Sequence, residues 1–438
     1  MNKSPSIDQA LAEYLGKQTK ATHFCVAYSG GMDSHVLLHA FAAALEPFPE
    51  MSLRAVYVDH GLHANSGHWA SHCKTTCDEF GIPMQVLTVN VEDTGNGPEA
   101  NARLARYAAF SENLLDDEQL LLAQHADDQA ETFLLQALRG SGPDGLASIP
   151  RKRTFANGYL CRPLLPCSQQ QLAEYASNHL LDWIEDPSNT NTAFDRNYLR
   201  NVVMPLLKER WPASVHTLSR SAKRSAAASQ TLLSIATEDL ELVRLRGSTE
   251  LSVSELRSLP RERAYNVLRI WARQSKLRMP RLQDLRQVLL NLINARDDSC
   301  GIVNVRDYEF RRHGDRLYLL PPQTNSQPFT YTWDAPFNEL LISETGITLS
   351  KQACREQGIK LPEQGSITVR NRSGGELIKL GEPAFHKAVK KLLQESSVPP
   401  WQRDSIPLLY VNDRLAAVWN IAVAVDFRTA TQNVVEIA

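Results

Sequence analysis

The first 210 residues alternate short runs rich in β-branched and aromatic residues with longer stretches of helical periodicity. This alternation predicts βαβ units, because parallel strands need long crossover connections that are usually helical. The expected strands are residues 22–28, 53–58, 84–89 and 119–123, and the expected helices are residues 36–45, 69–80, 99–114 and 127–139. We therefore predict an α/β fold with a doubly wound parallel sheet over residues 1–212.

The pattern changes in the rest of the chain. Long, charged helical stretches, with a strand signal only at 250–253, predict a mostly helical domain over residues 213–322. A proline-containing stretch at 320–328 is typical of a linker. Short strand-like runs broken by Gly and Pro follow, with one basic amphipathic helix at 384–394. A small α+β C-terminal domain over residues 329–438 is expected.

Composition narrows the functional classes. Hydrophobic residues make up 43% of the 438 residues and charged residues 22%, which is typical of globular proteins. The chain has no run of about 18 apolar residues and no secretory signal, so we expect a cytoplasmic protein with no membrane partner. Seven scattered cysteines, an odd number, indicate free thiols. The net charge of −2 gives no global attraction to nucleic acid, but residues 196–224 and 367–403 are locally basic.

One segment directly after the first expected strand has the character of a phosphate loop. It consists of Ser29, Gly30, Gly31, Met32, Asp33 and Ser34. Backbone N–H groups and the helix dipole at this position attract anions, and Asp33 can bind the magnesium that accompanies ATP. The lysine of a Walker loop is missing and the spacing is not G-x-G-x-x-G, so both of those nucleotide-binding classes are disfavoured. A plain tight turn is the alternative interpretation.

An acidic segment follows the fourth expected strand. Its residues are His125, Ala126, Asp127, Asp128, Gln129, Ala130, Glu131 and Thr132. On a helix, His125, Asp128 and Thr132 share one face, because residues three and four apart are neighbours. Acids at a helix N-terminus can bind magnesium or accept a proton, although simple N-capping of a surface helix is an alternative. Both segments would lie at the carboxyl ends of parallel strands, where open α/β sheets bind ligands.

These two segments carry a resemblance to a known family. The first matches the S-G-G-x-D-S loop of the N-type ATP pyrophosphatases, and the second resembles the H-x-x-D-x-x-E-T segment of the tRNA(Ile)-lysidine synthetases. Further matches to that family are residues 59–62, 102–107, 162–165, 185–189, 196–200 and, in its C-terminal domain, 374–376, 385–387, 390–391, 399–401, 403 and 407–410. The resemblance implies that ATP adenylates the wobble cytidine of the CAU anticodon in tRNA(Ile). Free lysine then displaces AMP, and decoding changes from AUG to AUA.

The resemblance also implies roles for individual residues. The loop of residues 29–34 and His60 are expected to bind ATP, and the expected catalytic residues are Asp33, Arg106, His125 and Asp128. Asp128 is the expected base toward lysine, with Asp127 or Glu131 as substitutes, and Arg106 is expected to neutralise the α-phosphate. Magnesium is expected on Asp33 and Asp128. Contacts with tRNA are expected from Arg196, Arg200, Arg370, Arg372, Lys387, Lys390, Lys391, Trp401 and Arg403.

Other interpretations stay open at this point. A tRNA thiolase or an amidotransferase-type ATP pyrophosphatase would share the fold, although the C-x-x-C of iron–sulfur thiolases is missing. A non-catalytic tRNA-binding module belongs to another functional class. A zinc site drawn from His60, His63, His68, His72, Cys73 and Cys77 is disfavoured, because helix neighbours such as His72 and Cys73 point about 100° apart. The oligomeric state is open, a homodimer included.

Overall fold

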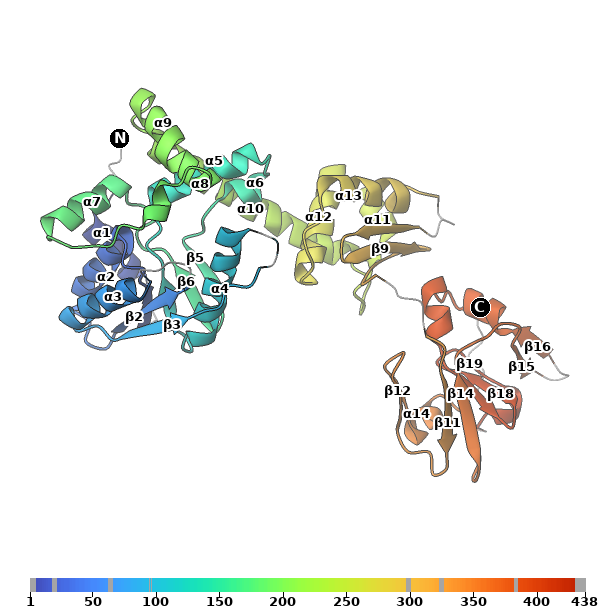
Figure 1. Ribbon diagram of the computed structural model, residues 1–438. Coiled ribbons are helices and arrows are strands. Elements are labelled where there is room, and N and C mark those ends of the chain that lie inside the picture. The colour runs from blue at the N-terminus through green and yellow to red at the C-terminus, as the bar shows by residue number, and fades with distance from the viewer. Residues whose placement is uncertain are drawn as a thin grey trace. The chain divides into compact units, whose positions relative to one another are not determined.

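The computed structural model describes residues 5–17, 22–61, 66–93, 95, 97–296, 301–322, 327–381 and 385–429. The chain divides into two compact units, Met1–Ile235 and Ala236–Ala438, which are described separately (Figure 1). Among the described residues no helix has both the length and the apolar character needed to cross a membrane.

A six-stranded sheet forms the centre of the first unit. In spatial order its strands are β3 (Met84–Thr88), β2 (Ser52–Asp59), β1 (His23–Ala27), β4 (Gln119–Leu121), β6 (Gly158–Cys161) and β5 (Lys152–Phe155). All neighbours pair in parallel except β5, which is antiparallel to β6. The predicted parallel sheet is confirmed. The strand order reverses next to β1, because β2 lies on one side of β1 and β4 on the other. In open α/β sheets, the carboxyl edge at such a position is where ligands bind.

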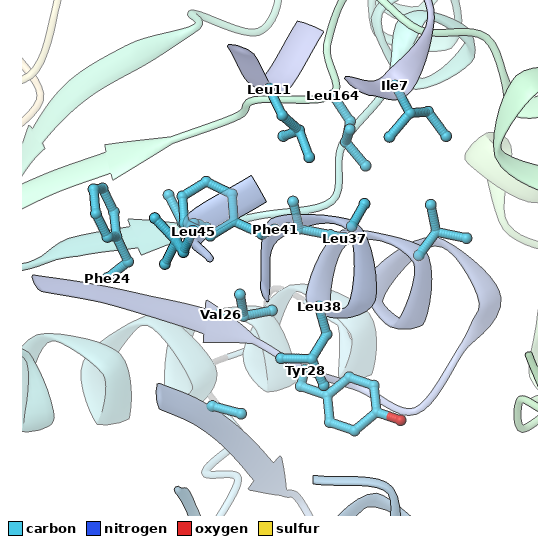
Figure 2. Packing of buried hydrophobic residues seen from close by; sticks show 14 of the residues in the cluster. Ile7, Leu11, Phe24, Val26, Tyr28, Leu37, Leu38, Phe41, Leu45 and Leu164 are labelled. Carbon is cyan, nitrogen blue, oxygen red and sulfur yellow. The ribbon is translucent and has the colours of Figure 1, made fainter. Parts of the chain in front are cut away.

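Helices cover both faces of this sheet. One face carries α1 (Ile7–Gly16), α2 (Met32–Leu45), α3 (Ser66–Glu79) and α7 (Gln169–Asn178), and the other carries α4 (Pro98–Asn113). Alternation along β1 directs Phe24 and Val26 toward the α2 side and Cys25 toward α4. Figure 2 shows Phe24 and Val26 close to Leu38 and Phe41 of α2. Burial on both faces explains why the central strand β1 is almost continuously apolar, whereas the edge strand β5 is polar and exposed.

The remaining elements of the first unit lie beyond β4. They are α5 (Ala126–Leu138), α6 (Pro143–Leu146), α8 (Asp195–Tyr198), a π-helical turn at Leu199–Val203, α9 (Met204–Arg210) and the start of α10 (Ser214–Val243). The β5–β6 hairpin was not predicted, because the run Lys152–Phe155 is polar and exposed and has no alternating apolar residues.

The second unit begins with the end of α10 and a helical layer. Its helices are α11 (Val253–Ser258), α12 (Arg261–Gln274) and α13 (Leu282–Val288). They pack on an antiparallel sheet in the order β7 (Leu251–Ser252), β10 (Arg316–Leu320), β9 (Tyr308–His313) and β8 (Ile302–Val305). The sequence predicted the helices and a strand signal at 250–253, where β7 lies, but not the other three strands of this sheet. Arginines interrupt the apolar pattern of β9, and Arg312 is nevertheless 1% exposed because backbone carbonyls of Leu292, Ala295 and Gly314 accept its N–H groups.

The C-terminal part contains a five-stranded sheet in the order β11 (Thr330–Asp334), β14 (Ser366–Arg370), β17 (Leu408–Val411), β18 (Arg414–Val418) and β19 (Ala422–Val423). Two hairpins, β12–β13 (Leu340–Ile342, Ile347–Leu349) and β15–β16 (Leu377–Gly381, Phe385–Ala388), and the helices α14 (Lys351–Glu356) and α15 (Val389–Glu395) complete it.

One prediction for this part is wrong. The basic helix expected over residues 384–394 begins only at Val389, because the residues before it pair as β16 with β15, with Lys387 opposite Ile378. Lys387 is therefore a strand residue and does not share a helix face with Lys390 and Lys391. Ala384, where the helix was expected to begin, lies outside the described residues.

Candidate active site

The loop after β1 turns the chain directly into α2. Tyr28 continues the pairing of β1 by donating its N–H to the carbonyl of Val56 at 2.9 Å. The hydroxyl of Ser34, in the first turn of α2, accepts the N–H of Ser29 at 3.2 Å and donates to the carbonyl of Gly31 at 2.9 Å. Ser34 therefore closes residues 29–34 into a compact loop at the N-terminus of α2, where an anion is favoured.

Gly30 is required at its position for two reasons. Its φ is +79°, a backbone conformation that residues other than glycine rarely adopt. A Cβ atom there would lie 2.8 Å from Cys73 Sγ and 2.8 Å from Ile184 Cδ1. The carbonyl of Gly30 also accepts the N–H of Ile184 at 2.9 Å. The segment around Ile184 and the helix that carries Cys73 therefore fix the loop from behind.

His125 caps the N-terminus of α5, one residue before the helix begins. Its Nδ1 accepts the N–H of Asp127 at 3.3 Å, and Asp128 Oδ2 accepts the N–H of His125 at 3.0 Å. The imidazole is 1% exposed. This reciprocal capping fixes both the ring and the Asp128 carboxylate at the carboxyl end of β4.

The loop and the acidic segment meet at this ring. His125 Nε2 lies 3.4 Å from Asp33 Oδ2 and 3.6 Å from Asp128 Oδ2. Burial alone would lower the pKa of His125, but the carboxylates of Asp128, Asp127 and Asp33 outweigh it and raise the pKa to about 10. His125 is therefore a cation at neutral pH, and in this form Nδ1 no longer accepts the Asp127 N–H but directs its own N–H toward Asp127 Oδ2, 3.7 Å away. The two segments that the sequence placed at one sheet edge are in contact, because β1 and β4 are adjacent parallel strands.

Arg196 and Arg200 point toward α5. Asp128 Oδ1 accepts Arg196 Nη2 at 2.7 Å and Arg200 Nη2 at 2.8 Å. Glu131 accepts Nε of Arg196 at 3.0 Å and Nε of Arg200 at 2.8 Å. The side chain of Glu131 is only 2% exposed. Burial would raise the pKa of Asp128, but His125, Arg196 and Arg200 hold it below its usual range. We name these four side chains, Asp128, Glu131, Arg196 and Arg200, the inner ion cluster.

Lys208 completes the charge balance and was not predicted from the sequence. Its Nζ lies 2.7 Å from Asp127 Oδ1, and the N–H of Gln169 donates to Asp127 Oδ2 at 2.8 Å. Burial would raise the pKa of Asp127, but the His125, Gln169 and Lys208 contacts hold it below its usual range. The only sign of Lys208 in the sequence was its place in the basic stretch 196–224, which we interpreted as a surface for tRNA and not as a source of partners for Asp127.

His60 and Arg106 form a pair at the same sheet edge. His60 directly follows β2, and its Nε2 accepts Nε–H of Arg106, from α4, at 3.2 Å. Burial and the guanidinium of Arg106 lower the pKa of His60, so it stays a neutral acceptor. The structure thus brings two predicted site residues from separate elements together.

A magnesium ion would find one suitable ligand in this geometry. Among the described residues, Asp33 Oδ1 is a buried oxygen that lacks a hydrogen-bond partner. Both oxygens of Asp128 are engaged by His125, Arg196 and Arg200.

The zinc alternative has no such support, because no cluster of three or more possible ligands occurs among the described residues. Cys73 and Cys77 are buried thiols whose pKa values burial raises to about 12, and His63 lies outside the described residues.

The predicted tRNA contacts of the second unit have varied surroundings. Lys390 and Lys391 are exposed on α15. Arg370 lies 4.4 Å from the Tyr410 ring centre, Arg372 Nε donates to Asp404 at 2.5 Å, Lys387 pairs with Glu395, and Arg403 Nε donates to the Val398 carbonyl at 2.9 Å. The Trp401 ring is edge-on to Tyr318, with ring centres 5.2 Å apart. Lys390 and Lys391 are thus the best-presented cations of this set.

Most of the chain matches known protein families. Residues 3–207 match a family described as a PP-loop domain, residues 251–318 a TilS substrate binding domain, and residues 367–437 a TilS substrate C-terminal domain. The tRNA(Ile)-lysidine synthase of Alkalilimnicola ehrlichii is 39% identical over 96% of this chain and 94% of its own length. That of Coxiella burnetii is 39% identical over 94% and 91%, and that of Xanthomonas campestris 41% over 94% and 93%. The chain therefore belongs to the tRNA(Ile)-lysidine synthase family.

Proposed function

We propose that this protein uses ATP to attach lysine to C2 of the wobble cytidine in tRNA(Ile) with a CAU anticodon. The observation that carries the proposal is the contact between Asp33 of the phosphate loop and His125 at the start of α5, with Nε2 and Oδ2 3.4 Å apart. This contact joins an anion-binding loop to a cluster of charged groups at one sheet edge. Adenylation followed by amine attack needs both features in one crevice.

The first step is adenylation of the cytidine. Cytidine O2 attacks the α-phosphorus of ATP, and the bond from that phosphorus to the pyrophosphate oxygen breaks. The loop of residues 29–34 receives the negatively charged phosphates, and the His125 imidazolium stabilises charge that develops on the phosphoryl oxygens. Arg106, held by its hydrogen bond to His60, is the proposed partner of the α-phosphate.

The second step replaces AMP by lysine. The ε-nitrogen attacks C2, the C2–O bond breaks, and AMP leaves with the former O2. We propose that Asp128 orients the amine and takes its proton as the new C–N bond makes that nitrogen acidic. The low pKa of Asp128 keeps it ionised, so it attracts the ammonium form that lysine has before it reacts. In this proposal Arg196 and Arg200 position Asp128 instead of contacting tRNA.

Magnesium, when bound, would offset the charge of the polyphosphate. Asp33 is the residue that we propose as its ligand, because Oδ1 is buried without a protein partner. Asp128 is left out of this assignment, although the sequence suggested it, because we assign its carboxylate to lysine. Contacts with tRNA are proposed for Arg370, Arg372, Lys387, Lys390, Lys391, Trp401 and Arg403, with the exposed Lys390 and Lys391 first. We further propose a cytoplasmic location, where ATP, lysine and tRNA are available.

Incubation of the whole chain with ATP, labelled lysine and an unmodified tRNA(Ile) transcript tests the proposal. We expect label in the tRNA, one AMP for each lysine attached, and no label in a transcript whose anticodon cytidine is replaced by uridine. Release of AMP without label in the tRNA would assign the crevice to another adenylating enzyme, such as a thiolase. Binding of tRNA with neither product would leave only a binding module.

A further inference from the structure

The second unit contains a middle part, β7 to β10 with α11 to α13, whose sheet packs its helices against one face. Tyr308 and Phe310 of β9 point into the apolar core that these helices cover. Because side chains alternate along a strand, Arg311 and His313 of β9 point to the opposite face, and so does Tyr318 of β10, which pairs with Arg311. We name Arg311, His313 and Tyr318 the second sheet face. Tyr318 is only 7% exposed, so this face is covered as well.

Trp401 of the C-terminal part, β11 to β19, covers the second sheet face. Its ring centre lies 5.2 Å from that of Tyr318 and 6.1 Å from that of His313, with interplanar angles of 83° and 80°. The Arg311 guanidinium carbon lies 5.1 Å from the Trp401 ring centre. Edge-to-face ring pairs and a cation over an indole both add to the stabilisation that apolar burial provides. Three side chains of the middle part therefore contact one side chain of the C-terminal part.

The local structure around Trp401 presents its ring to another part of the chain. The residue lies in the 3₁₀ helix Pro400–Ser405, directly after Pro399 and Pro400, whose rings fix the backbone φ. Among the described residues, neither apolar core of the C-terminal part includes Trp401. The indole Nε1 is buried and has no hydrogen-bond partner in the described part of the chain. Packing against the middle part, and not a polar contact, therefore holds the ring.

The charges at this contact favour a protein partner over a phosphate. Arg311, the cation over the Trp401 ring, is itself paired with Glu309 at 2.7 Å, so its guanidinium already has a counter-ion. Burial lowers the pKa of His313, against a hydrogen bond with the backbone of Ser397, so the imidazole is neutral at pH 7. Ser397 thus adds a second segment of the C-terminal part to the contact.

We propose that Trp401 docks the C-terminal part on the second sheet face, so that the middle and C-terminal parts act as one body. The consequence extends to α15, which ends two residues before Ser397 and carries the exposed Lys390 and Lys391. Docking fixes this helix relative to the middle part. A tethered but undocked part would lose its freedom only on binding, and this cost weakens any ligand that contacts both parts. A direct contact between Trp401 and tRNA is a different role, and measurements without RNA separate the two.

Hydrogen–deuterium exchange of the whole chain, without RNA, ATP or lysine, tests the docking. We expect Trp401→Ala to speed exchange in residues 309–319 of the middle part roughly tenfold, and Tyr318→Leu to do the same in residues 396–405 of the C-terminal part. Each substitution thus acts on the part that does not contain it. Peptides from β14 should keep their protection in both variants, which shows that the C-terminal part is folded.

Two further variants serve as controls. Trp401→Phe should exchange like the wild type, because it keeps an aromatic ring and removes an N–H group that has no partner. Leu341→Ala, which removes a 58% exposed apolar side chain from β12 of the same part, should also have no effect. Unchanged exchange of residues 309–319 in Trp401→Ala, or of residues 396–405 in Tyr318→Leu, would overturn the proposal.

Affinity for an unmodified tRNA(Ile) transcript gives a second measurement, which rests on the proposed function. We expect Trp401→Ala and Tyr318→Leu each to weaken binding roughly three- to tenfold, and the double variant to bind no worse than the weaker single variant, because the parts undock only once. The slope of log affinity against log salt should stay constant, since no phosphate contact is removed. Weaker binding in Trp401→Ala alone would assign Trp401 to tRNA and contradict docking. Failure of lysine attachment would leave the exchange result intact, so the two proposals fail separately.

Discussion

Asp33 shares its surroundings with other carboxylates and has one buried oxygen, Oδ1, without a hydrogen-bond partner. Asp33→Asn should therefore leave the fold intact, because the amide keeps the shape and removes a charge from an acidic cluster. We expect lysine attachment to fall by a factor of about 10² or more, since the substitution weakens electrostatic stabilisation of the reacting phosphates. Labelled-lysine incorporation and a thermal melt measure the two effects. Asp8→Asn, in the first turn of α1, is the matched control and should keep normal turnover.

His125 makes stability depend on pH in a defined direction. Its pKa rises from 6.5 to about 10 on folding, so the imidazolium contributes stability that is complete below pH 6.5 and is lost as pH rises through about 10. The difference in unfolding free energy between wild type and His125→Asn should shrink over this window by up to about 5 kcal/mol. Asp127 and Asp128 stay ionised throughout, because their pKa values are held low. Urea unfolding of both proteins at each pH measures the difference, and a constant difference would contradict a charged His125.

Alanine substitutions at Gly30 and at Gly81 distinguish the cost of backbone strain from the cost of steric crowding. Both have a positive φ, +79° and +67°, but an added Cβ meets Cys73 and Ile184 at Gly30 and nothing within 4 Å at Gly81. Gly81→Ala should cost about 1 to 2 kcal/mol, the left-handed penalty alone. Gly30→Ala should cost roughly 1 to 3 kcal/mol more and weaken ATP binding, because the loop must move. Unfolding curves and nucleotide titration measure both, and equal costs at the two glycines would show that the loop is not held from behind.

At the scale of elements, the inner ion cluster attaches α8 and the π-helical turn to α5. Arg200→Gln leaves Glu131 and Asp128 buried with fewer partners, so we expect a loss of roughly 3 to 5 kcal/mol in unfolding free energy. Adding Glu131→Gln should recover part of that loss, because the orphaned charge disappears. A double-mutant cycle measures the coupling. The exposed pair Lys74 and Asp78 serves as control and should show little coupling, and additive effects at Arg200 and Glu131 would argue against a rigid attachment.

Elements with strong periodicity could be predicted, and those defined by partners could not. The segments of helices α2 to α5 have helical periodicity and clear end signals, so the sequence pattern was sufficient to predict these helices. The strand β16 has no such pattern and exists because Leu377–Gly381 pairs with it, so the residues before Val389 appeared to belong to the helix. Likewise the motif residues 125–132 indicated the site, but the direction of Arg196 and Arg200 depends on tertiary contacts. A basic stretch in the sequence predicts local positive charge. It does not predict whether a given arginine or lysine pairs with a carboxylate of the protein or with a phosphate of the substrate.

At the scale of the whole molecule, the two compact units divide the chemistry from most of the proposed RNA contacts. Asp33, His125 and the inner ion cluster all belong to Met1–Ile235, whereas Lys390 and Lys391 belong to Ala236–Ala438. The sequence predicted three domains, and the boundaries 1–212, 213–322 and 329–438 stay a prediction, supported by three separate family matches. In this proposal, residues of the second unit contribute binding energy for tRNA, and residues of the first unit act on the reacting atoms.

This division predicts how a change in the second unit affects the kinetics. Lys390→Ala with Lys391→Ala should raise KM for tRNA roughly tenfold at physiological salt and leave kcat unchanged, because phosphate contacts that do not change during the reaction bind substrate and transition state equally. Lys351→Ala with Lys360→Ala is the matched control, since these exposed lysines lie in the same unit outside the basic stretch 367–403. Steady-state lysine incorporation over a range of tRNA concentrations measures both constants. A lower kcat with normal KM would mean that α15 takes part in assembling the reacting complex, and an unchanged KM would remove Lys390 and Lys391 from the RNA-binding surface.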